Sequence, residues 1–386
     1  MKLKLVESKK DIKAFLEAPI DIYKDDPNWV RPLDKDIEET FDRDKNKFFK
    51  YGDAVRWILF DDNGKSIGRV AAFYDGKTAK SFEQPTGGMG FYECIDNMDA
   101  ANMLFNQCKD WLTEQGMEAM DGPINFGEKN KWWGLLVDGF TAPIYNMSYH
   151  LPYYRTQFEA FGFQTYYEQY CFTIPLGGEV PERYFTKAER ISSKPGYHIE
   201  NIKKSKLEKY AEDFRKIYNE AWVKYDNQKP MESRQAISIF KRLKPIIEPR
   251  LVYFAYFNNE PIAFFIMLPE INQIIRHLNG SFNWWAKLKF KYYQLTGECD
   301  RVFGLVFGVI PRYQGMGVEA FMIIDANKKM LKQSKYHEIE LNWIGDFNPK
   351  MLKVAENLDA KIHRTYITMR VLFDQNKEYK RRPIMD

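Results

Sequence analysis

The sequence predicts an α/β protein of the α+β kind, with a mixed sheet, in which one unit occurs twice in tandem. Each unit is expected to be a central mixed β-sheet flanked by helices. Three observations predict this fold class. The chain has 386 residues, about twice the length of an ordinary domain. Its predicted elements follow the same order in both halves, and the second half contains a buried strand joined to a helix by a glycine turn.

The first half is predicted from hydrophobic periodicity and turn residues. Asp62-Asn63-Gly64 between two apolar runs is a strong hairpin signal. The predicted elements in chain order are a strand at 2–6, a helix from about residue 9, strands at 55–60, 67–74 and 90–95, a helix at 98–114, a strand at 117–124, an irregular stretch at 125–150, a helix at 153–161 and a strand at 166–174.

The second half repeats this order after two breaks, Gly177-Gly178 and Lys194-Pro195-Gly196. Its predicted elements are a strand at 198–202, a helix at 205–222, hairpin strands at 251–257 and 262–268, the strand and helix of 302–333, a strand at 339–344, a helix from about residue 348 and a strand at 361–373. We therefore expect a first unit at 1–178, a linker at 179–197 and a second unit at 198–386.

The glycine turn joins the strand and the helix of 302–333. The run at 302–310 is continuously apolar, as in a strand buried on both faces, and Pro311 ends it because proline cannot donate to a ladder. Gly315 and Gly317 let the backbone approach a ligand closely, and the helix that follows offers unpaired amides and a positive dipole end. The turn therefore indicates a pyrophosphate site. A tight turn without a ligand is the alternative.

The spacing Arg312-x-x-Gly315-x-Gly317, directly after Val309-Ile310-Pro311, resembles the signature of the GNAT acyltransferase superfamily. This resemblance implies that loop amides hold the pyrophosphate of acetyl-coenzyme A or another acyl-coenzyme A, used as co-substrate, and that the preceding strand edge pairs with the pantetheine amides. On this reading the residues that bind the co-substrate are Phe307, Val309, Arg312, Gln314, Gly315, Met316, Gly317, Val318 and Asn348.

The whole chain resembles a group of bacterial tandem GNAT proteins whose substrate is unassigned. Matching stretches include Gly122-Pro-Ile-Asn-Phe126, Pro269-Glu-Ile-Asn-Gln273 and Glu340-Leu-Asn-Trp343. The resemblance implies a second unit that binds acyl-coenzyme A. Sliding the halves on each other places Glu93 and Asp96 opposite Arg312 and Gly315. Because carboxylates repel a pyrophosphate, we expect the first unit to be a degenerate copy that shapes the substrate cleft.

Two positions bear on the departing thiol in the family's reaction. Asn348 matches an asparagine that commonly touches coenzyme A in GNAT proteins, although an Asn before Pro349 is also a favoured helix N-cap. Many GNAT enzymes carry a tyrosine seven residues later that protonates the thiolate, and here that position is Ala355. Either another group such as Tyr366 acts as the acid, or the thiolate leaves without one.

Acyl transfer to an amine needs a base, because an ammonium has no lone pair and a lysine-like amine has a pKa of about 10.4. The first candidate is Glu340, on the strand beside the glycine-turn strand, and a solvated residue or a salt bridge is the plainer interpretation. The second is Glu270, with Asn272 as a substrate contact, where the plainer interpretation is a turn with a capping residue.

Composition limits the partners. The net charge is +4, from 57 basic and 53 acidic residues, so nothing indicates a nucleic-acid partner. The N-terminus has no apolar core of a signal peptide, and no run reaches the ~20 apolar residues of a membrane span. We therefore expect a cytoplasmic protein without stable membrane insertion. The four cysteines show no C-x-x-C pair and the five histidines no metal-ligand spacing, so we expect no metal.

The segment 282–295 alternates aromatic residues with lysines. At helical spacing one stripe consists of Trp284, Leu288, Tyr292 and Leu295. The plainest interpretation is an amphipathic helix that covers the sheet. The alternatives are an apolar wall for a longer acyl chain and an interfacial membrane helix.

Together these observations predict an acyl-coenzyme A-dependent N-acyltransferase, an N-acetyltransferase in the simplest case, whose acceptor is a small-molecule or peptide amine. A non-catalytic acyl-coenzyme A-binding or sensor protein and a long-chain acyltransferase are the alternatives. Fem-type aminoacyltransferases, another tandem class, would not need the pyrophosphate turn at Gly315 and Gly317. A homodimer is left open.

Overall fold

The structure is a computed structural model that describes residues 1–176, 180–221, 230–333 and 335–385. In the first half, α1 begins at a capping box made by Ser8 and Asp11, and α3 begins at Asn97, whose side chain accepts from the Ala100 amide. The elements are β1 (Lys2–Leu5), α1 (Lys9–Ile22), α2 (Asp34–Phe41), β2 (Gly52–Phe60), β3 (Ser66–Asp75), β4 (Thr86–Cys94), α3 (Met98–Glu114), β5 (Ala119–Gly122), β6 (Leu135–Asp138), α4 (Tyr154–Phe161), β7 (Gln164–Pro175) and α5 (Glu182–Ser192).

The second half follows the predicted order and adds two helices. Its elements are β8 (Tyr197–Asn201), α6 (Leu207–Ala221), α7 (Ser233–Leu243), β9 (Val252–Phe257), β10 (Glu260–Pro269), α8 (Asn272–Ile275), α9 (Trp284–Thr296), β11 (Arg301–Val309), α10 (Val318–Gln333), β12 (Glu338–Gly345), α11 (Pro349–Asn357) and β13 (Lys361–Leu372). Periodicity did not predict α7, α8, α2 or the short β6, while α9 corresponds to the helix predicted at 282–295. The predicted strand at 117–124 ends early, at Gly122, because Pro123 cannot donate to the ladder.

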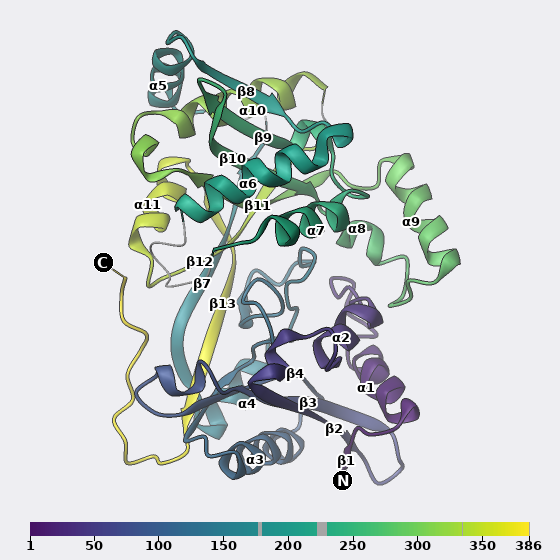
Figure 1. The fold of residues 1–386 in the computed structure, drawn as a ribbon. Helices are drawn as coiled ribbons and strands as arrows, with labels where there is room; N and C mark the ends of the chain where they lie inside the picture. The colour runs from purple at the N-terminus through teal and green to yellow at the C-terminus, as the bar shows by residue number, and fades with distance from the viewer. Residues whose placement is uncertain (177–179, 222–229, 334, 386) are drawn as a thin grey trace.

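The described residues form one continuous sheet of thirteen strands that runs through both halves (Figure 1). The strand order is β1-β2-β3-β4-β5-β13-β7-β12-β11-β10-β9-β8, with β6 attached to β13. The pairs β4–β5 and β11–β12 are parallel, and the other pairs within the described residues are antiparallel. The sheet is therefore mixed and helices flank it, as the sequence predicts.

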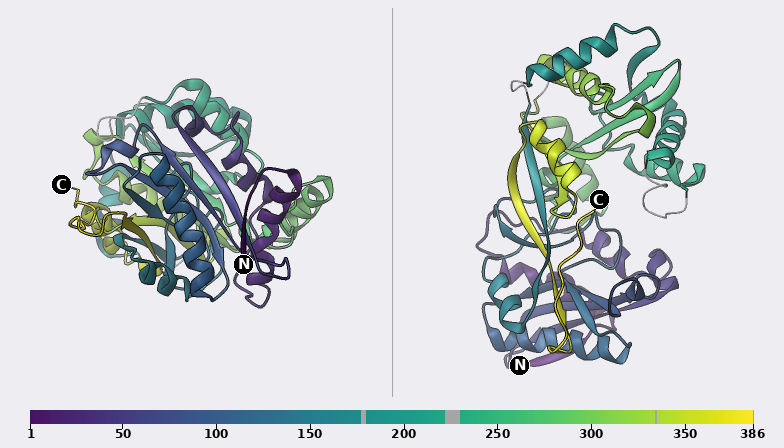
Figure 2. Two further views of the ribbon diagram at one scale, coloured as in Figure 1. Left: turned by 90° about the horizontal axis from the view of Figure 1, so that it is seen from below. Right: turned by 90° about the vertical axis from the view of Figure 1, so that its left-hand side faces the viewer.

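The two halves exchange their last strands. The strand β7 closes the first half in chain order but pairs with β12 of the second half, and β13 closes the chain but pairs with β5 of the first half. The exchanged strands also pair with each other, and both views show them running together from one half into the other (Figures 1 and 2). The predicted break at Gly177-Gly178 lies outside the described residues, directly after β7.

The helix α9 departs from the plainest prediction for its segment. Its inner face packs through Ala286, Phe290 and Tyr293 into two apolar clusters, one of which also contains Val30 and Leu33 of the first half. The predicted stripe of Trp284, Leu288, Tyr292 and Leu295 does not cover the sheet and is exposed. Within the described residues, no helix is long and apolar enough to cross a membrane.

Candidate functional site

The parallel strands β11 and β12 part halfway along their length. They are paired from Arg301 opposite Glu338 to Gly304 opposite Leu341, and the ladder stops there. Both strands continue: β11 stays paired with β10 as far as Val309, and β12 stays paired with β7 as far as Gly345. The facing edges beyond the Gly304–Leu341 pair therefore carry backbone amides and carbonyls that the ladder does not use.

Strand irregularities cluster at this level of the sheet. In β11, Leu305 is an extra residue opposite the Ile266–Met267 step of β10. In β12 the pairing with β7 shifts between Leu341 and Ile344, and in β13 His363 is the extra residue. Bulges re-aim side chains and end local pairing, and they are over-represented next to active sites. The irregularities in β11, β12 and β13 thus lie in the part of the sheet where β11 and β12 separate.

The glycine turn lies at the end of β11, next to the parted strands. Gly315 and Gly317 have φ angles of 70° and 103°, a conformation that favours glycine. A Cβ at Gly315 would meet nothing within 4 Å, so the space beside it is open, whereas a Cβ at Gly317 would meet Lys187 and Ile191 of α5 at 3.3–3.4 Å. The first glycine therefore faces open space, and the second lets α10 pack against α5.

The side chains of the turn fix its shape. Gln314 donates from Nε2 to the carbonyl oxygen of Val309 at 3.0 Å, which braces the turn against the strand end. The Gly315 amide donates to Oε1 of Glu319, in the first turn of α10, at 3.3 Å. A carboxylate therefore already accepts from an amide at this helix N-terminus, as anions do at such positions.

Cationic side chains surround the turn. Arg190 of α5 donates from Nη2 to the carbonyl oxygen of Met316 at 2.9 Å. Arg312 is largely exposed and lies 3.9 Å from a carboxylate oxygen of Glu220. Two guanidinium groups therefore lie at the turn, which suits a polyanion such as a pyrophosphate.

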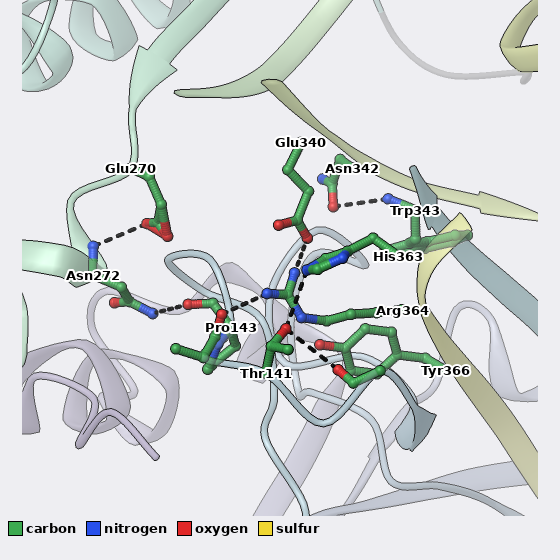
Figure 3. A network of polar contacts seen from close by, with 12 residues as sticks. Thr141, Pro143, Glu270, Asn272, Glu340, Asn342, Trp343, His363, Arg364 and Tyr366 are labelled. Atoms are coloured by element: carbon green, nitrogen blue, oxygen red, sulfur yellow. Dashed lines mark hydrogen bonds and ion pairs between the residues drawn. The ribbon is translucent and has the colours of Figure 1, made fainter. Parts of the chain in front are cut away.

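Glu340 is buried in an ion pair beside the point where the strands part (Figure 3). It precedes Leu341, the last residue of the β12 ladder with β11. Its Oε1 contacts Nη1 of the fully buried Arg364 of β13, which also donates from Nη2 to the Ala142 carbonyl oxygen. Within the described residues, Glu340 Oε2 has no hydrogen-bond partner. The carboxylate therefore keeps one oxygen uncommitted.

Glu270, at the end of β10, is buried and only partly hydrogen-bonded (Figure 3). Its Oε1 accepts from the backbone amides of Asn272 and Tyr145 at 2.9 and 3.0 Å. Its Oε2 has no hydrogen-bond partner among the described residues. Burial raises the pKa of Glu270 to about 7, against the two backbone hydrogen bonds that lower it, and the Glu340 carboxylate raises it further. A carboxyl group that titrates near neutral pH suits a general base.

Asn272 and Tyr366 are tied to the irregular segment of the first half. Asn272 donates from Nδ2 to the Pro143 carbonyl oxygen at 2.9 Å, and the Tyr366 hydroxyl donates to the Ser148 carbonyl oxygen at 2.9 Å. Burial raises the pKa of Tyr366 well above its usual range. Both polar groups therefore join the second half, at the start of α8 and at β13, to the segment at 141–148.

Asn348 caps α11, with its side chain accepting from the Met351 amide at 3.2 Å, and Ala355 on the same helix is buried. The remaining predicted contacts divide by exposure. Val318 and Val309 are buried, Phe307 is partly buried, and Met316 is exposed. The structure thus brings the strand end, the turn and the start of α10 together, with the two carboxylates farther along the sheet.

The corresponding corner of the first half is occupied by side chains of that half. Glu93 is buried at the end of β4, where it accepts from the Tyr23 and Tyr154 hydroxyl groups at 2.6 and 3.0 Å and lies 3.5 Å from Arg69. The Tyr153 hydroxyl donates to the Cys94 carbonyl oxygen at 2.8 Å. With Asn97 capping α3, side chains satisfy this corner from within the chain.

The sequence patterns did not predict several residues of the site. Arg364 pairs with Glu340, Arg190 lies on the turn, and the segment at 141–148 supplies backbone partners. A signal was present for Arg364, because an arginine within a mostly apolar strand requires a buried partner. No comparable signal marked the other two. Among the described residues, no set of three His, Cys, Asp or Glu side chains could hold a metal ion.

Comparisons with known proteins agree with this architecture. No family model matches the chain. It is 26% identical over 368 residues to a bacterial ceramide synthase of Caulobacter vibrioides, covering 94% of each chain. It is also 26% identical over 368 residues to protein YghO of Escherichia coli, covering 93% of this chain and 92% of that one.

Solved structures share the fold at low sequence identity. A tandem GNAT protein from the clavulanic acid biosynthesis pathway superposes with a TM-score of 0.55 at 9% identity, over 96% of this chain and 99% of that chain. The glucosamine N-acetyltransferase region of a fungal multi-domain β-N-acetylglucosaminidase gives a TM-score of 0.55 at 14% identity, over 96% of this chain and 38% of that chain. The predicted fold is confirmed: the chain has the tandem GNAT fold.

Proposed function

We propose that this chain with the tandem GNAT fold is an acyltransferase that moves an acyl group from acyl-coenzyme A to the amine of an acceptor. The observation that carries the proposal is the parting of β11 and β12 beyond the Gly304–Leu341 pair, next to an open glycine turn. Unpaired strand edges can hold the amides of a pantetheine arm, and the turn can hold its pyrophosphate.

The residues present fit acyl-coenzyme A. Open space at Gly315, the amides at the start of α10 and the cations Arg190 and Arg312 suit the phosphates. Glu319 opposes them, so its carboxylate must leave the Gly315 amide when a phosphate binds. When bound, acyl-coenzyme A supplies an activated acyl thioester. A backbone amide of β11 near the Leu305 bulge would hold the thioester oxygen.

The two buried carboxylates have different tasks in this proposal. Glu340 lies next to the parting of the strands, and its uncommitted Oε2 would orient the acceptor amine. Glu270, with a pKa of about 7, would accept the amine proton on Oε2. The amine nitrogen then bonds to the acyl carbon as the carbon–sulfur bond breaks, and the excess proton left on nitrogen passes to the departing thiolate or to solvent. Thiols titrate near ~8.5, so the sulfur can leave as a thiolate without an acid. Tyr366, committed to Ser148, would only support the site.

The relative named a ceramide synthase suggests the acceptor. A ceramide is the amide of a fatty acid with a long-chain amino alcohol. We therefore infer that this chain uses a long-chain acyl-coenzyme A and an amine on a lipid-like molecule, in preference to acetyl transfer to a peptide. What supports this is the 26% identity over 94% of both chains.

The test is turnover by the purified full chain, read as released thiol with a thiol reagent. Acyl donors from acetyl- to long-chain acyl-coenzyme A are crossed with a small amine, a lysine peptide and a long-chain amino alcohol. The protein adds little background, because its four cysteines are buried, and burial raises the pKa of Cys94 and Cys299 to about 12. We expect thiol release with the long-chain donor and the amino alcohol.

The control is Gly315→Asp, which should lower turnover about tenfold or more at a donor concentration below KM, because its carboxylate repels the phosphates. Turnover with acetyl-coenzyme A and the peptide alone would overturn the lipid acceptor but keep the acyltransferase. Tight coenzyme A binding without turnover for any pair would favour the sensor alternative, which the buried Ala355 in place of a tyrosine keeps open.

A further inference from the structure

The outer face of α9 is apolar and exposed. Five large side chains point outward: Trp284, Trp285, Leu288, Tyr292 and Leu295, each between 46% and 74% exposed. At ~100° per residue they fall within one arc of about 100° along the helix. In Figure 1 the helix lies at the edge of the second half, away from the sheet. Five of the sixteen exposed large hydrophobic side chains of the described residues lie on these thirteen residues, which makes this a patch rather than chance exposure.

Lysines border this apolar stripe on both sides. Lys287 and Lys291 follow one edge and Lys289 the other, and the helix carries no acidic residue. All three lysines are exposed. Lys291 donates to Gln294, and Lys287 lies 5.8 Å above the Phe282 ring. Within the described residues none of the three forms an ion pair, so their charges face outward.

The inner face holds α9 firmly in place. Ala286 is buried with Ile271 and Ile275, and the Tyr293 ring stacks on His277 at 4.2 Å. Asn283 caps the start of the helix, and Gly297 ends it. The outward stripe is therefore a fixed feature of the fold and not a loose segment. The stripe lies on the side of α9 opposite to the inner face that packs on Ile271, the residue that follows Glu270.

We propose that α9 docks the protein onto the surface of a bilayer that contains anionic phospholipids. Tryptophan and tyrosine favour the headgroup region because one part of each ring is apolar and the other is polar. Flanking lysines meet the negative headgroups, and the apolar stripe enters the acyl boundary. The helix lies in the interface and does not span it. The proposal stands apart from the reaction, because it rests on the exposed face alone.

A second copy of the chain fits this face poorly. A two-fold dimer through α9 would set the same surface against itself. Each row of lysines would then meet lysines, with no carboxylate on either helix to neutralise them. An anionic bilayer supplies the charge that the helix lacks.

The experiment is vesicle co-sedimentation of the full chain without substrates. Vesicles of phosphatidylcholine alone are compared with vesicles of phosphatidylcholine and phosphatidylglycerol, at low and high salt. We expect binding to the mixed vesicles that weakens at high salt, together with a blue shift of tryptophan fluorescence. The double variant Trp284→Gln, Trp285→Gln should reduce binding by about tenfold or more. Tyr51→Gln, at another exposed aromatic residue, should not.

A charge test uses matched variants. Replacement of Lys287, Lys289 and Lys291 by Glu should abolish binding to the mixed vesicles. The same change in net charge at the exposed lysines of the second half, Lys203, Lys204 and Lys206, should not. Absence of wild-type binding, or binding unchanged in the tryptophan variant, would overturn the proposal. So would sedimentation equilibrium without vesicles that shows a dimer lost in that variant, since the stripe would then be a subunit contact.

Discussion

Replacing Glu270 by Gln tests whether burial raises its pKa, and the test does not require a known substrate. The glutamine oxygen can still accept from the Asn272 and Tyr145 amides, so the local hydrogen bonds can persist. What changes is the titration. In the folded chain the pKa of Glu270 rises from 4.5 to about 7, mainly because burial disfavours the charged form.

The sign follows from proton linkage. Between these two pKa values the folded chain holds a proton that the unfolded chain has released, so folding stability falls as pH rises through this window. This loss of stability is absent below the pKa of the unfolded chain and complete above the pKa of the folded chain. A rise from 4.5 to about 7 corresponds to about 3 kcal/mol of folding free energy.

The assay is urea unfolding of wild type and Glu270→Gln across this pH range. The difference in unfolding free energy should move by about 3 kcal/mol in favour of the variant between about pH 4 and pH 8. Glu260→Gln is the control, because it makes the same change at the exposed start of β10 and should give no such movement. A difference that stays constant with pH would refute the burial argument.

Activity gives the second readout of the same variant. For wild type, kcat/KM should rise with pH up to about 7 as Glu270 loses its proton. In the variant, kcat/KM should be about a hundredfold or more lower, which is the usual contribution of a general base. It should also no longer rise with pH up to about 7. If the variant showed the expected change in stability but kept the wild-type dependence of rate on pH, Glu270 would be buried as described but would not transfer the proton.

Three further outcomes are expected. Gly315→Asp should lower coenzyme A affinity about tenfold or more in titration calorimetry, because a carboxylate near the phosphates costs about 1–4 kcal/mol. Asp96→Gly, at the corresponding position of the first half, should leave the affinity unchanged. A stoichiometry of more than one coenzyme A per chain would contradict a single site in the second half. Glu319→Gln should raise the same affinity several-fold by freeing the Gly315 amide, and weaker binding would show that its role in the helix start dominates. Glu340→Gln should lower the free energy of unfolding in urea by about 3–5 kcal/mol, because Arg364 stays buried without its partner. Adding Arg364→Met should recover part of that loss. If Glu340→Gln alone left the free energy of unfolding unchanged, the ion pair would not contribute to stability as expected.

Local patterns in the sequence predicted the local structure. The hairpin at Asp62-Asn63-Gly64, the helix at 98–114 and the strand–turn–helix of 302–333 appear where the turn residues and periodicities indicate. These features depend on residues close together in the chain. The sequence also offered both buried carboxylates as candidates: Glu340 because it lies on the strand beside the glycine-turn strand, and Glu270 because it lies in the turn at 269–273.

Long-range pairing could not be predicted in the same way. The exchange of β7 and β13 depends on which distant strand each one meets, and their own apolar patterns suit either neighbour. The environment of Glu270 depends on burial by a segment more than a hundred residues away, so its raised pKa has no local signal. For α9 the period was read correctly, but an apolar stripe does not say whether it faces the sheet or the solvent.

The strand exchange explains what the first half contributes to the site. Its irregular segment meets the second-half strands β10 and β13 through main-chain atoms: the Tyr145 amide binds Glu270, and the carbonyl oxygens of Ala142, Pro143 and Ser148 accept from Arg364, Asn272 and Tyr366. Because main-chain amides and carbonyls are common to almost all residue types, this contribution produces no recognisable motif in the sequence. It depends on the backbone path, which the exchanged strands hold. The first half can therefore build part of the polar environment of the second through its main chain, and substitutions that move the segment at 141–148 should alter the site more than substitutions of its outward-facing side chains.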